Sequence, residues 1–431
     1  MKIYNYPSRS AEQRINRIVN RGLAFDKKDM AAVNSICENV RKRGDKAVIS
    51  YTKRFDSARV TTRSMRVSKK EFAGAAQKVD GPFKRALNRA AANIKRFHEQ
   101  QVRRSWMQTG RPGTLLGQLI HPVDAAGVYV PGARGGQTPL VSSVLMGVIP
   151  AKVAGVKRIA MVTPPTKGGG VSPHLLVAAK KAGVDAVYKA GSAWAIAALA
   201  YGTETIPKVD VIVGPGNIYV TLAKKILAGT VGIDMIAGPS EILIIADESA
   251  RPDFIAADLL SQAEHDVLSS ALLITDSQQL ARAAVKEIKG QLAHLPRAEI
   301  ARESLAKYGA VIVVPNIAVA IEMANRIAPE HLELQIRDPF EVVGKIHNAG
   351  AVFLGDYTPE PVGDYIAGPN HVLPTAGTAR FASALSVDNF IKKTSLIQYT
   401  KKAFEREAPD IIRLAEIEGL GAHAGSIKIR L

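Results

Sequence analysis

The pattern of hydrophobic and polar positions divides the chain into segments of different character. Residues 1–120 are predicted to be mostly helical, with polar and charged faces. From about residue 125, short runs of β-branched residues alternate with alanine-rich stretches of helical length, as in AGVYVPG, RIAMVTPP, HLLVAAKKAG and VDAVYKA. This alternation predicts an α/β unit whose parallel strands are buried on both faces.

A second series of the same kind follows a break at AGPSE, near residues 238–242. The stretch SSALLITDSQQLARAAVKEIKG predicts a strand, a cap at Asp276 or Ser277, and a helix. The stretch GAVIVVPNIAVAIEMANRI repeats this plan with Asn316 as the cap, and GAVFLG predicts a further strand. The chain is therefore predicted to carry two similar α/β units in tandem, followed by a helical segment after about residue 385.

The composition narrows the class of protein. A chain of 431 residues with 47% hydrophobic residues is long enough for more than one folded domain. No stretch approaches the roughly 20 uninterrupted apolar residues of a membrane helix, and the first residues lack the apolar core of a signal peptide. Cys37 is the only cysteine, so an intramolecular disulfide and a zinc site with several cysteines are excluded. We expect a cytoplasmic protein with no membrane partner.

The formal charge of +18 is compatible with binding either nucleic acid or anionic small molecules. Basic residues are dense in KRALNRAAANIKRFHEQQVRR, but this stretch predicts a helix with an apolar inner face, so they are best explained as a solvated face. Zinc-finger spacing, an RNP-type aromatic motif and a basic tail are all missing from the sequence. We therefore expect no nucleic-acid partner, and a basic nucleic-acid-binding protein remains an alternative.

Polar residues gather at the end of one predicted helix, in DLLSQAEHD at residues 258–266. Asp258, Gln262 and His265 are four and three positions apart, so they share one face of that helix. This face is either a solvated surface or a place where Gln262 and His265 reach one ligand together, such as a metal ion.

Three further stretches carry candidate chemistry. In VGPGNIYV a strand leads through glycines into a helix at Asn217, which favours either an anionic ligand at the helix N-terminus or a simple tight turn. In RIAPEHLEL, Glu330 beside His331 offers two proton-transfer groups. The glycine- and proline-rich stretch GDYIAGPNHVLPTAGTARF predicts a loop that carries Asp364, Asn370 and His371. If these nitrogen and oxygen donors converge, they suit zinc or a similar divalent cation.

As a set, these motifs resemble the histidinol dehydrogenase family. The stretches that carry the resemblance follow the family's order over roughly residues 35–425: IPAKVAGV, AYGTETIPKVD, VGPGNIYV, GIDMIAGPSEILIIAD, DLLSQAEHD, APEHLEL, GDYIAGPNHVLPT and EGLGAHAGS. A G-x-G-x-x-G dinucleotide fingerprint is missing from the sequence, in agreement with the incomplete Rossmann-like domains that the resemblance implies.

The resemblance implies an α/β fold with two incomplete Rossmann-like domains in tandem, small helical segments at both ends, and an intertwined homodimer. The implied parts are a helical arm at 1–26, a first Rossmann-like domain with the metal and catalytic residues at 27–126 plus 240–382, a second on the NAD side at 127–239, and a dimerisation tail at 383–431.

The activity that the resemblance implies is the last step of histidine biosynthesis. L-Histidinol is oxidised to L-histidine through bound L-histidinaldehyde, with two NAD⁺, one water and one Zn²⁺ per subunit. His331 would be the base that takes the alcohol proton, and Glu330 would activate water on the aldehyde. The implied zinc ligands are Gln262, His265 and Asp364 of one subunit and His423 of its partner.

The resemblance also implies a set of binding residues. The implied substrate contacts are Ser240, Gln262, His265, His331, Asp364, His371, Glu418 and His423, of which Glu418 and His423 are shared across the homodimer. Tyr129 and Asn217 match positions that contact NAD. The runner-up interpretation is a related zinc- and NAD-dependent dehydrogenase of another polar alcohol.

Three departures from the family pattern lie in the implied cofactor half. Gly191-Ser192-Ala193-Trp194 replaces the common Gly-Gly-Ala-Gln, so Trp194 occupies the place of an NAD-contacting glutamine. We expect Trp194 either to stack on a ring of the cofactor, the interpretation we favour, or to fill space. The loop PGARGGQTPLVSSVLM is longer than usual, and Val211 stands where lysine is common.

Overall fold

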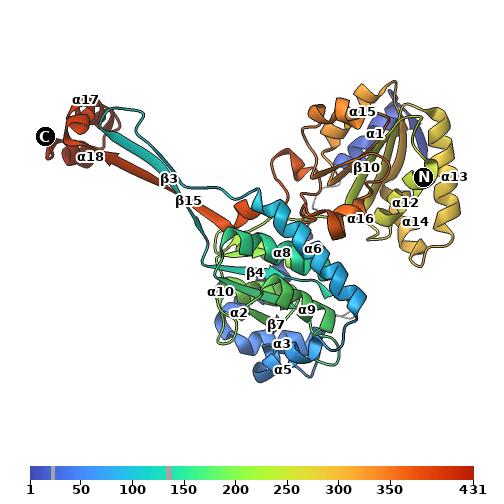
Figure 1. Cartoon of the computed structure of the whole chain (residues 1–431), viewed down its shortest axis with the longest axis horizontal. Coiled ribbons are helices and arrows are strands. Elements are labelled where there is room, and N and C mark those ends of the chain that lie inside the picture. Colours follow the sequence, from blue (N-terminus) through green and yellow to red (C-terminus); the bar gives the residue numbers. More distant parts are fainter. Residues whose placement is uncertain (21–24, 133–137) are drawn as a thin grey trace. The chain divides into compact units, whose positions relative to one another are not determined.

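The computed structural model describes residues 1–20, 25–132 and 138–431. The chain forms two compact units, one of Met1–Gln101 with Asp124–Phe390 and a smaller one of Val102–Val123 with Ile391–Leu431. Part of the loop that is longer than the family's, residues 133–137, lies outside the described residues. Figure 1 labels the elements of both units.

The first of two parallel sheets in the larger unit has six strands in the order β1-β12-β11-β10-β13-β14. The strands are β1 (Ile3–Asn5), β10 (Glu241–Ala246), β11 (Ser270–Thr275), β12 (Gly309–Val313), β13 (His331–Gln335) and β14 (Ala351–Leu354). Alternate residues of β10 face opposite layers, as period-two geometry requires. Ile242 and Ile244 join a core with α12 (Pro252–Ala263), α13 (Gln278–Leu292) and α14 (Ala298–Tyr308).

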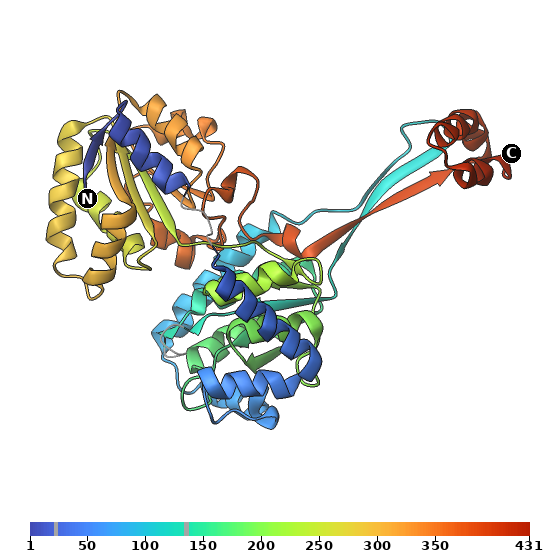
Figure 2. The ribbon, with the colours of Figure 1, turned by 180° about the vertical axis from the view of Figure 1, so that it is seen from behind.

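Leu243 and Ile245 point to the other face of this sheet. They form a separate core with α1 (Arg9–Val19) and α15 (Ile317–Ile327). Figure 2 shows α1, in dark blue near the N-terminus, lying across this face. Two helices of this sheet, α13 and α15, begin at the predicted polar caps: the Ser277 hydroxyl accepts from Leu280 N at 3.2 Å, and the Asn316 side chain accepts from Val319 N at 3.0 Å. Of the two cap candidates before α13, Ser277 is the cap.

The second parallel sheet has five strands in the order β7-β6-β4-β8-β9. The strands are β4 (Ala125–Tyr129), β6 (Arg158–Thr163), β7 (Ala186–Lys189), β8 (Val211–Val213) and β9 (Gly232–Ile233). One layer contains α10 (Ser192–Tyr201), α11 (Ile218–Leu227), α2 (Lys27–Arg43) and α3 (Asp45–Phe55), which share one core with the sheet. Helix α8 (Val141–Ala154) also packs on β4 and contacts α6 (Gly81–Glu99) and α9 (Pro173–Ala182).

Both sheets wind in the same way. Starting from β10 in one sheet and β4 in the other, the chain adds two strands on one side, then crosses to the opposite side for the next two. The point of reversal lies between β10 and β13 in the first sheet and between β4 and β8 in the second. This duplication confirms the predicted fold class of two tandem α/β units with parallel sheets.

The division of the chain into four parts stays a prediction, and the packing adds one fact to it. Helices α2 and α3, from the segment 27–126, pack on helices of the five-stranded sheet: α2 contacts α10 and α11, α3 contacts α10, and both share the core of that sheet. Val33, Cys37 and Val40 of α2 share a core with α10, because their spacing places them on one helix face. The short elements α4 (Thr62–Met65), α5 (Lys69–Ala75) and β5 (Thr138–Pro139) complete the larger unit before residue 140.

The smaller unit is an antiparallel sheet with two helices. Its strands are β2 (Trp106–Gln108), β3 (Thr114–Pro122) and β15 (Ile391–Tyr399) in the order β15-β3-β2, followed by α17 (Lys401–Ile417) and α18 (Gly421–Lys428), which pack on each other. Large apolar side chains stay exposed, including Ile397, Leu414, Ile417 and Ile429. Such a surface marks an interaction site in a protein of this size. In neither unit do the described residues form a helix with the length and apolar character to cross a membrane.

Two residues at the carboxyl edge of the five-stranded sheet, Gly214 and Ser192, have positive φ angles. Gly214 has φ +114°, and a Cβ there would lie 2.2 Å from the Tyr129 carbonyl oxygen, so only glycine fits. Ser192, where the family commonly has glycine, has φ +48° at the first residue of α10. Its backbone N donates to the Tyr129 hydroxyl at 3.1 Å. A non-glycine residue in this conformation costs about 1–2 kcal/mol.

We predict that Ser192→Gly raises the free energy of unfolding by about 0.5–1 kcal/mol, because relief of the left-handed strain outweighs the added freedom of glycine in the unfolded chain. Urea unfolding monitored by circular dichroism measures the change. Ala193→Gly is the matched control: this buried neighbour lies in the helix, and the change should cost about 1 kcal/mol. Destabilisation by both variants would show that the Ser192 backbone is not strained.

Candidate active site

The predicted catalytic pair lies at the amino edge of the six-stranded sheet. Glu330 directly precedes β13, His331 is its first residue, and Ser240 directly precedes the neighbouring strand β10. Both Glu330 and His331 are buried. The sheet therefore holds the predicted proton-transfer groups and one predicted substrate contact at the ends of two adjacent strands.

One hydrogen bond determines the protonation of His331. Its Nδ1 lies 2.9 Å from the backbone carbonyl oxygen of Glu241, which can only accept, so Nδ1 carries the hydrogen. Nε2 then has a free lone pair. Burial lowers the pKa of His331 to about 4, and the ring is neutral at physiological pH. A neutral imidazole with a free Nε2 is a suitable general base.

Glu330 lies beside this base in a setting that favours its protonated form. One carboxylate oxygen accepts from the Glu241 backbone N at 2.8 Å and lies 3.7 Å from His331 Nδ1. Burial, aided by the nearby carboxylates of Glu241, Asp364 and Glu360, raises the pKa of Glu330 well above its usual value. A carboxyl group with a pKa shifted upward can exchange a proton near neutral pH.

Gln262 is the strongest structural indication of a ligand. It lies in the last turn of α12 with only 1% of its surface exposed, and neither its Oε1 nor its Nε2 has a hydrogen-bond partner. Leaving buried polar groups unpaired costs about 1–3 kcal/mol each. The solvated-face interpretation of this helix is therefore wrong, since Asp258 and Gln262 are both buried. His265 follows the helix with an exposed imidazole, and its backbone N donates to the Gln262 carbonyl at 3.2 Å.

Asp364 and His371 lie together in the predicted loop. Asp364 belongs to the π-helical turn η3 (Gly363–Ala367), and its Oδ1 lies 3.7 Å from His371 Nδ1. His371 Nε2 is buried without a hydrogen-bond partner, so it too is a free ligand atom or acceptor. The short helix α16 (Glu360–Val362) precedes the predicted loop, which begins with this π-helical turn and contains one 3-10 turn at Thr378–Arg380.

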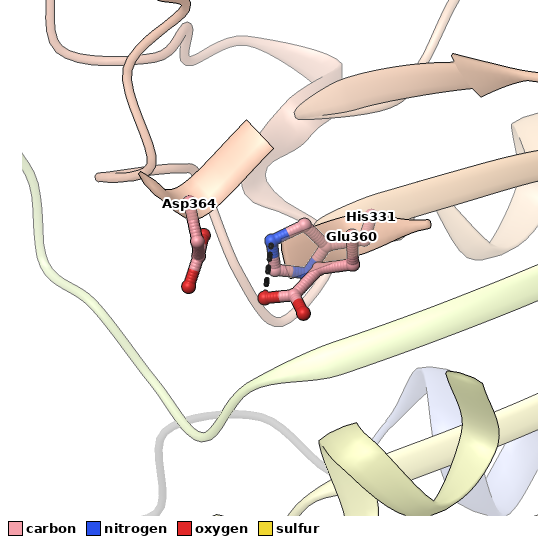
Figure 3. Close-up of side chains that lie close together, drawn as sticks. All are labelled: His331, Glu360 and Asp364. Atoms are coloured by element: carbon pink, nitrogen blue, oxygen red, sulfur yellow. Dashed lines mark ion pairs between the residues drawn. The ribbon is translucent and has the colours of Figure 1, made fainter. Parts of the chain in front are cut away.

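Glu360 joins this cluster and was not predicted from the sequence. Figure 3 shows its carboxylate facing His331, with Oε1 3.9 Å from Nε2, and Asp364 nearby. One ligand atom of each of these three residues lies within 4.8 Å of the others. Burial and Asp364 raise the pKa of Glu360 to about 8. Its spacing of four from Asp364 is a helical signal, but the prolines and glycines around it obscured that signal.

A buried polar network behind the cluster connects the elements that carry it. Gln335 Nε2 donates to Asp258 Oδ2 at 2.8 Å and to Glu333 Oε2 at 2.9 Å, and Glu333 Oε1 accepts from the backbone N of Glu360 at 3.0 Å. These bonds tie α12, β13 and α16 together. Each of these elements carries or adjoins a predicted site residue. Gln262 lies in α12, His331 lies in β13, and Asp364 follows α16.

A cavity of about 570 Å³ opens beside these residues. His331, Asp364 and His371 supply polar groups to its wall, and Phe97, Val352, Phe353 and Leu373 are among its apolar lining residues. A mostly apolar cavity with a few convergent polar groups is the usual form of a small-molecule site.

Two predicted site residues belong to the smaller unit. Glu418 caps the end of α17, His423 lies on α18, and both are exposed. Their proposed contributions to a site shared between subunits stay predictions.

The predicted NAD contacts lie at the carboxyl edge of the five-stranded sheet. Tyr129 ends β4, and Asn217 caps α11 directly after β8, with its Oδ1 accepting from Val220 N at 3.2 Å. These two strands flank the reversal point of the sheet, where open α/β sheets bind their ligands. The topology thus brings both residues to the same edge of the sheet, and their contact with NAD stays a prediction.

Trp194 does not take the role we favoured for it. The indole is 4% exposed and stacks against the rings of Tyr51 and Phe55 at centroid distances of 5.7 and 5.6 Å. Its Nε1 donates to Thr52 Oγ1 at 3.1 Å. The side chain fills the core between α10 and α3, so we do not propose it as a cofactor contact.

Comparison with known proteins agrees with this geometry. A sequence model of the histidinol dehydrogenase family matches residues 20–431. Histidinol dehydrogenase of Desulfotalea psychrophila is 54% identical over 97% of this chain and 96% of its own, and that of Heliobacterium mobile is 53% identical over 100% and 99%. The crystal structure of histidinol dehydrogenase from Elizabethkingia anophelis superimposes with a TM-score of 0.93 at 40% identity, covering 100% of this chain and 98% of that one.

We predict that Glu330→Gln stabilises the protein at neutral pH. Because the pKa of Glu330 is raised in the folded state, the unfolded chain loses this proton above the ordinary pKa of 4.5 while the folded chain retains it. Stability is therefore lost as the pH rises, and glutamine avoids this loss. We therefore expect the variant to have a higher free energy of unfolding than the wild type near pH 7.5.

Urea unfolding between about pH 4 and pH 8 tests this expectation, because the gain should vanish at the acidic end. Glu322→Gln, an exposed substitution on α15, is the matched control and should give no pH-dependent gain. A Glu330→Gln variant that is less stable than the wild type near neutral pH would contradict the assigned protonation of this residue.

Proposed function

The chain belongs to the histidinol dehydrogenase family, and from this premise we propose that it oxidises L-histidinol to L-histidine with NAD⁺. The observation that carries the proposal is the buried His331 with a free Nε2, beside the carboxyl of Glu330 whose pKa is raised. The unpaired buried amide of Gln262 supports it. The reaction consumes two NAD⁺ and one water, passes through bound L-histidinaldehyde, and completes histidine biosynthesis.

His331 and Glu330 divide the proton transfers. In the first oxidation, His331 Nε2 accepts the hydroxyl proton as hydride leaves the carbinol carbon for NAD⁺. In the second, Glu330 in its ionised form takes a proton from water, whose oxygen adds to the aldehyde carbon, and the hydrate then gives up its hydride to a second NAD⁺. Glu330 Oε2 lies 3.7 Å from His331 Nδ1, so the two proposed proton-transfer groups are neighbours at one edge of the sheet.

The metal that the family implies fits the donors in the larger unit. Gln262, His265 and Asp364 offer one amide oxygen, one imidazole nitrogen and one carboxylate, which are suitable ligands for Zn²⁺. The unpaired buried amide of Gln262 supports this assignment. Zn²⁺ held by these three residues would supply a Lewis-acid centre that orients the substrate. Ser240, His371 and Glu418 are proposed to complete the substrate contacts, and Tyr129 and Asn217 to contact NAD.

A homodimer with shared sites is part of the proposal. Leu414 and Ile417 of α17 are 62% and 66% exposed, and Ile397 of β15 and Ile429 of α18 are exposed as well. In a two-fold dimer the smaller unit of a second copy would bring the same apolar surface into contact with this surface, so that both are buried. Glu418 and His423 lie on the same unit, so dimerisation through it gives them a route to the partner's metal and substrate.

We predict that the purified protein forms two NADH for each L-histidine made from L-histidinol, because the alcohol must lose two hydrides to become the acid. Chelation should abolish turnover and added Zn²⁺ should restore it. Absorbance at the NADH band together with chromatography of histidine gives the ratio. No NADH from histidinol alongside turnover of another polar alcohol would replace the proposed substrate, and full activity of the metal-free protein would overturn the metal assignment.

Co-expression of two inactive variants tests the shared site. His423→Asn removes the borrowed ligand and His265→Asn removes a ligand of the body. In a mixed dimer one site joins an intact body to an intact tail, while the other site carries both lesions. Random pairing makes about half of the dimers mixed, so activity should return to roughly a quarter of wild type. Verified mixed dimers that stay inactive would show that His423 serves its own subunit.

A further inference from the structure

An ion pair is buried in the half of the larger unit that holds the proposed cofactor contacts. Lys224 lies on α11 and Asp234 follows β9; the two side chains pair with each other and are 3% and 0% exposed. Taking two charges out of water is costly, and such a pair is weak support for stability by itself. Stability alone therefore does not explain why this ion pair is buried at this place in the fold.

Both partners of this ion pair bind the backbone of one residue, Gly214. Gly214 N donates to Asp234 Oδ2 at 2.8 Å, and Lys224 Nζ donates to the Gly214 carbonyl oxygen at 3.0 Å. The other carboxylate oxygen of Asp234 accepts from Met235 N at 2.7 Å. The pair thus satisfies both polar backbone groups of a residue that has left the β8 ladder.

Gly214 is the first residue of the turn from β8 into α11. With φ +114° and its Cα against the Tyr129 carbonyl, it brings the ends of β4 and β8 close together. The turn ends at Asn217, the cap of α11, and residues 217–219 are exposed. Because Lys224 belongs to α11 itself, the ion pair fixes the strand end, the turn and the direction of the helix as one body.

We propose that Lys224 and Asp234 are positioning residues for the dinucleotide, which hold the Gly214–Asn217 turn in the shape that receives it. A helix N-terminus behind a glycine turn binds anionic groups through backbone N–H groups, whose directions must be fixed before binding. The charged pair holds Gly214 more firmly than neutral hydrogen bonds would, since charge-assisted bonds are about twice as strong. The inference rests on the proposed NAD-dependent function.

The experiment separates positioning from stability with three variants. Lys224→Met leaves the Asp234 carboxylate buried and unpaired. Lys224→Met with Asp234→Asn removes both charges, and with them the bond to the Gly214 carbonyl. Lys224→Arg keeps a charge and donors but places them farther along the side chain. The matched control, Lys152→Met with Asp185→Asn, removes a pair at the opposite edge of the same sheet, where Asp185 accepts from Lys152 Nζ at 3.3 Å and from Ile159 N at 2.7 Å.

Each holoenzyme variant is measured by urea unfolding, by NADH titration followed by fluorescence, and by the KM values for NAD⁺ and histidinol. Lys224→Met should lose both stability and NADH affinity. The double variant should regain stability because no charge is left unpaired, while its Kd for NADH stays about tenfold or more above wild type, the size of effect that a misplaced binding group produces. The KM for histidinol should stay within about twofold, and the control pair should leave the Kd for NADH unchanged.

A stable double variant that binds NADH as tightly as wild type overturns the proposal, as does an equal loss of affinity in the control. If the double variant does not fold, the Lys224→Arg variant tests the proposal. A raised KM for NAD⁺ with an unchanged KM for histidinol supports the positioning role, and two unchanged KM values overturn it. Wild-type protein that neither binds NADH nor reduces NAD⁺ would refute the proposed function instead, so the two failures are distinguishable.

Discussion

The hydrogen bond from His331 Nδ1 to the Glu241 carbonyl is the interaction on which the site depends. It joins the first residues of two adjacent parallel strands, β10 and β13, and it fixes the imidazole tautomer at the same time. Without it, the buried ring could place its hydrogen on Nε2 and would no longer be a base toward the cavity. The same two strands place Glu330 and Ser240 at this edge, so the register of the sheet sets the geometry of the proton transfers.

The two sheets have the same strand order but use opposite edges. In the five-stranded sheet, Tyr129 and Asn217 lie at the carboxyl edge, the usual ligand position of an open α/β sheet. In the six-stranded sheet, that edge has a hollow of about 630 Å³ lined by the carboxylates of Asp247, Glu248, Asp276, Asp338 and Glu341. Like charges there disfavour a pyrophosphate. The proposed catalytic pair lies at the amino edge instead, so under the proposed function the two similar sheets carry different chemistry.

Local signals in the sequence were sufficient for the layers. Alternation of strands and helices and the cap at Asn316 depend on neighbours within a few positions. The predicted shared helix face of Gln262 and His265 was wrong, because α12 ends at Ala263, before His265. The network of Asp258, Glu333 and Gln335 depends instead on residues brought together from α12 and β13, and Glu360 was hidden in a stretch of prolines. The role of Trp194 was misjudged because its partners Tyr51 and Phe55 lie more than a hundred positions earlier in the chain.

Buried polar atoms without a hydrogen-bond partner lower the stability of the folded protein, and a ligand that pairs with them would remove this loss. Among the buried side-chain atoms without a hydrogen-bond partner in the described segments are Gln262 Oε1 and Nε2 and His371 Nε2, all in proposed site residues. A core chosen only for stability would replace such groups by apolar ones. A metal or substrate that occupies these atoms binds only the folded state and stabilises it by linkage. The unpaired groups of Gln262 and His371 therefore support a ligand at the proposed site, and the bound form should be the more stable one.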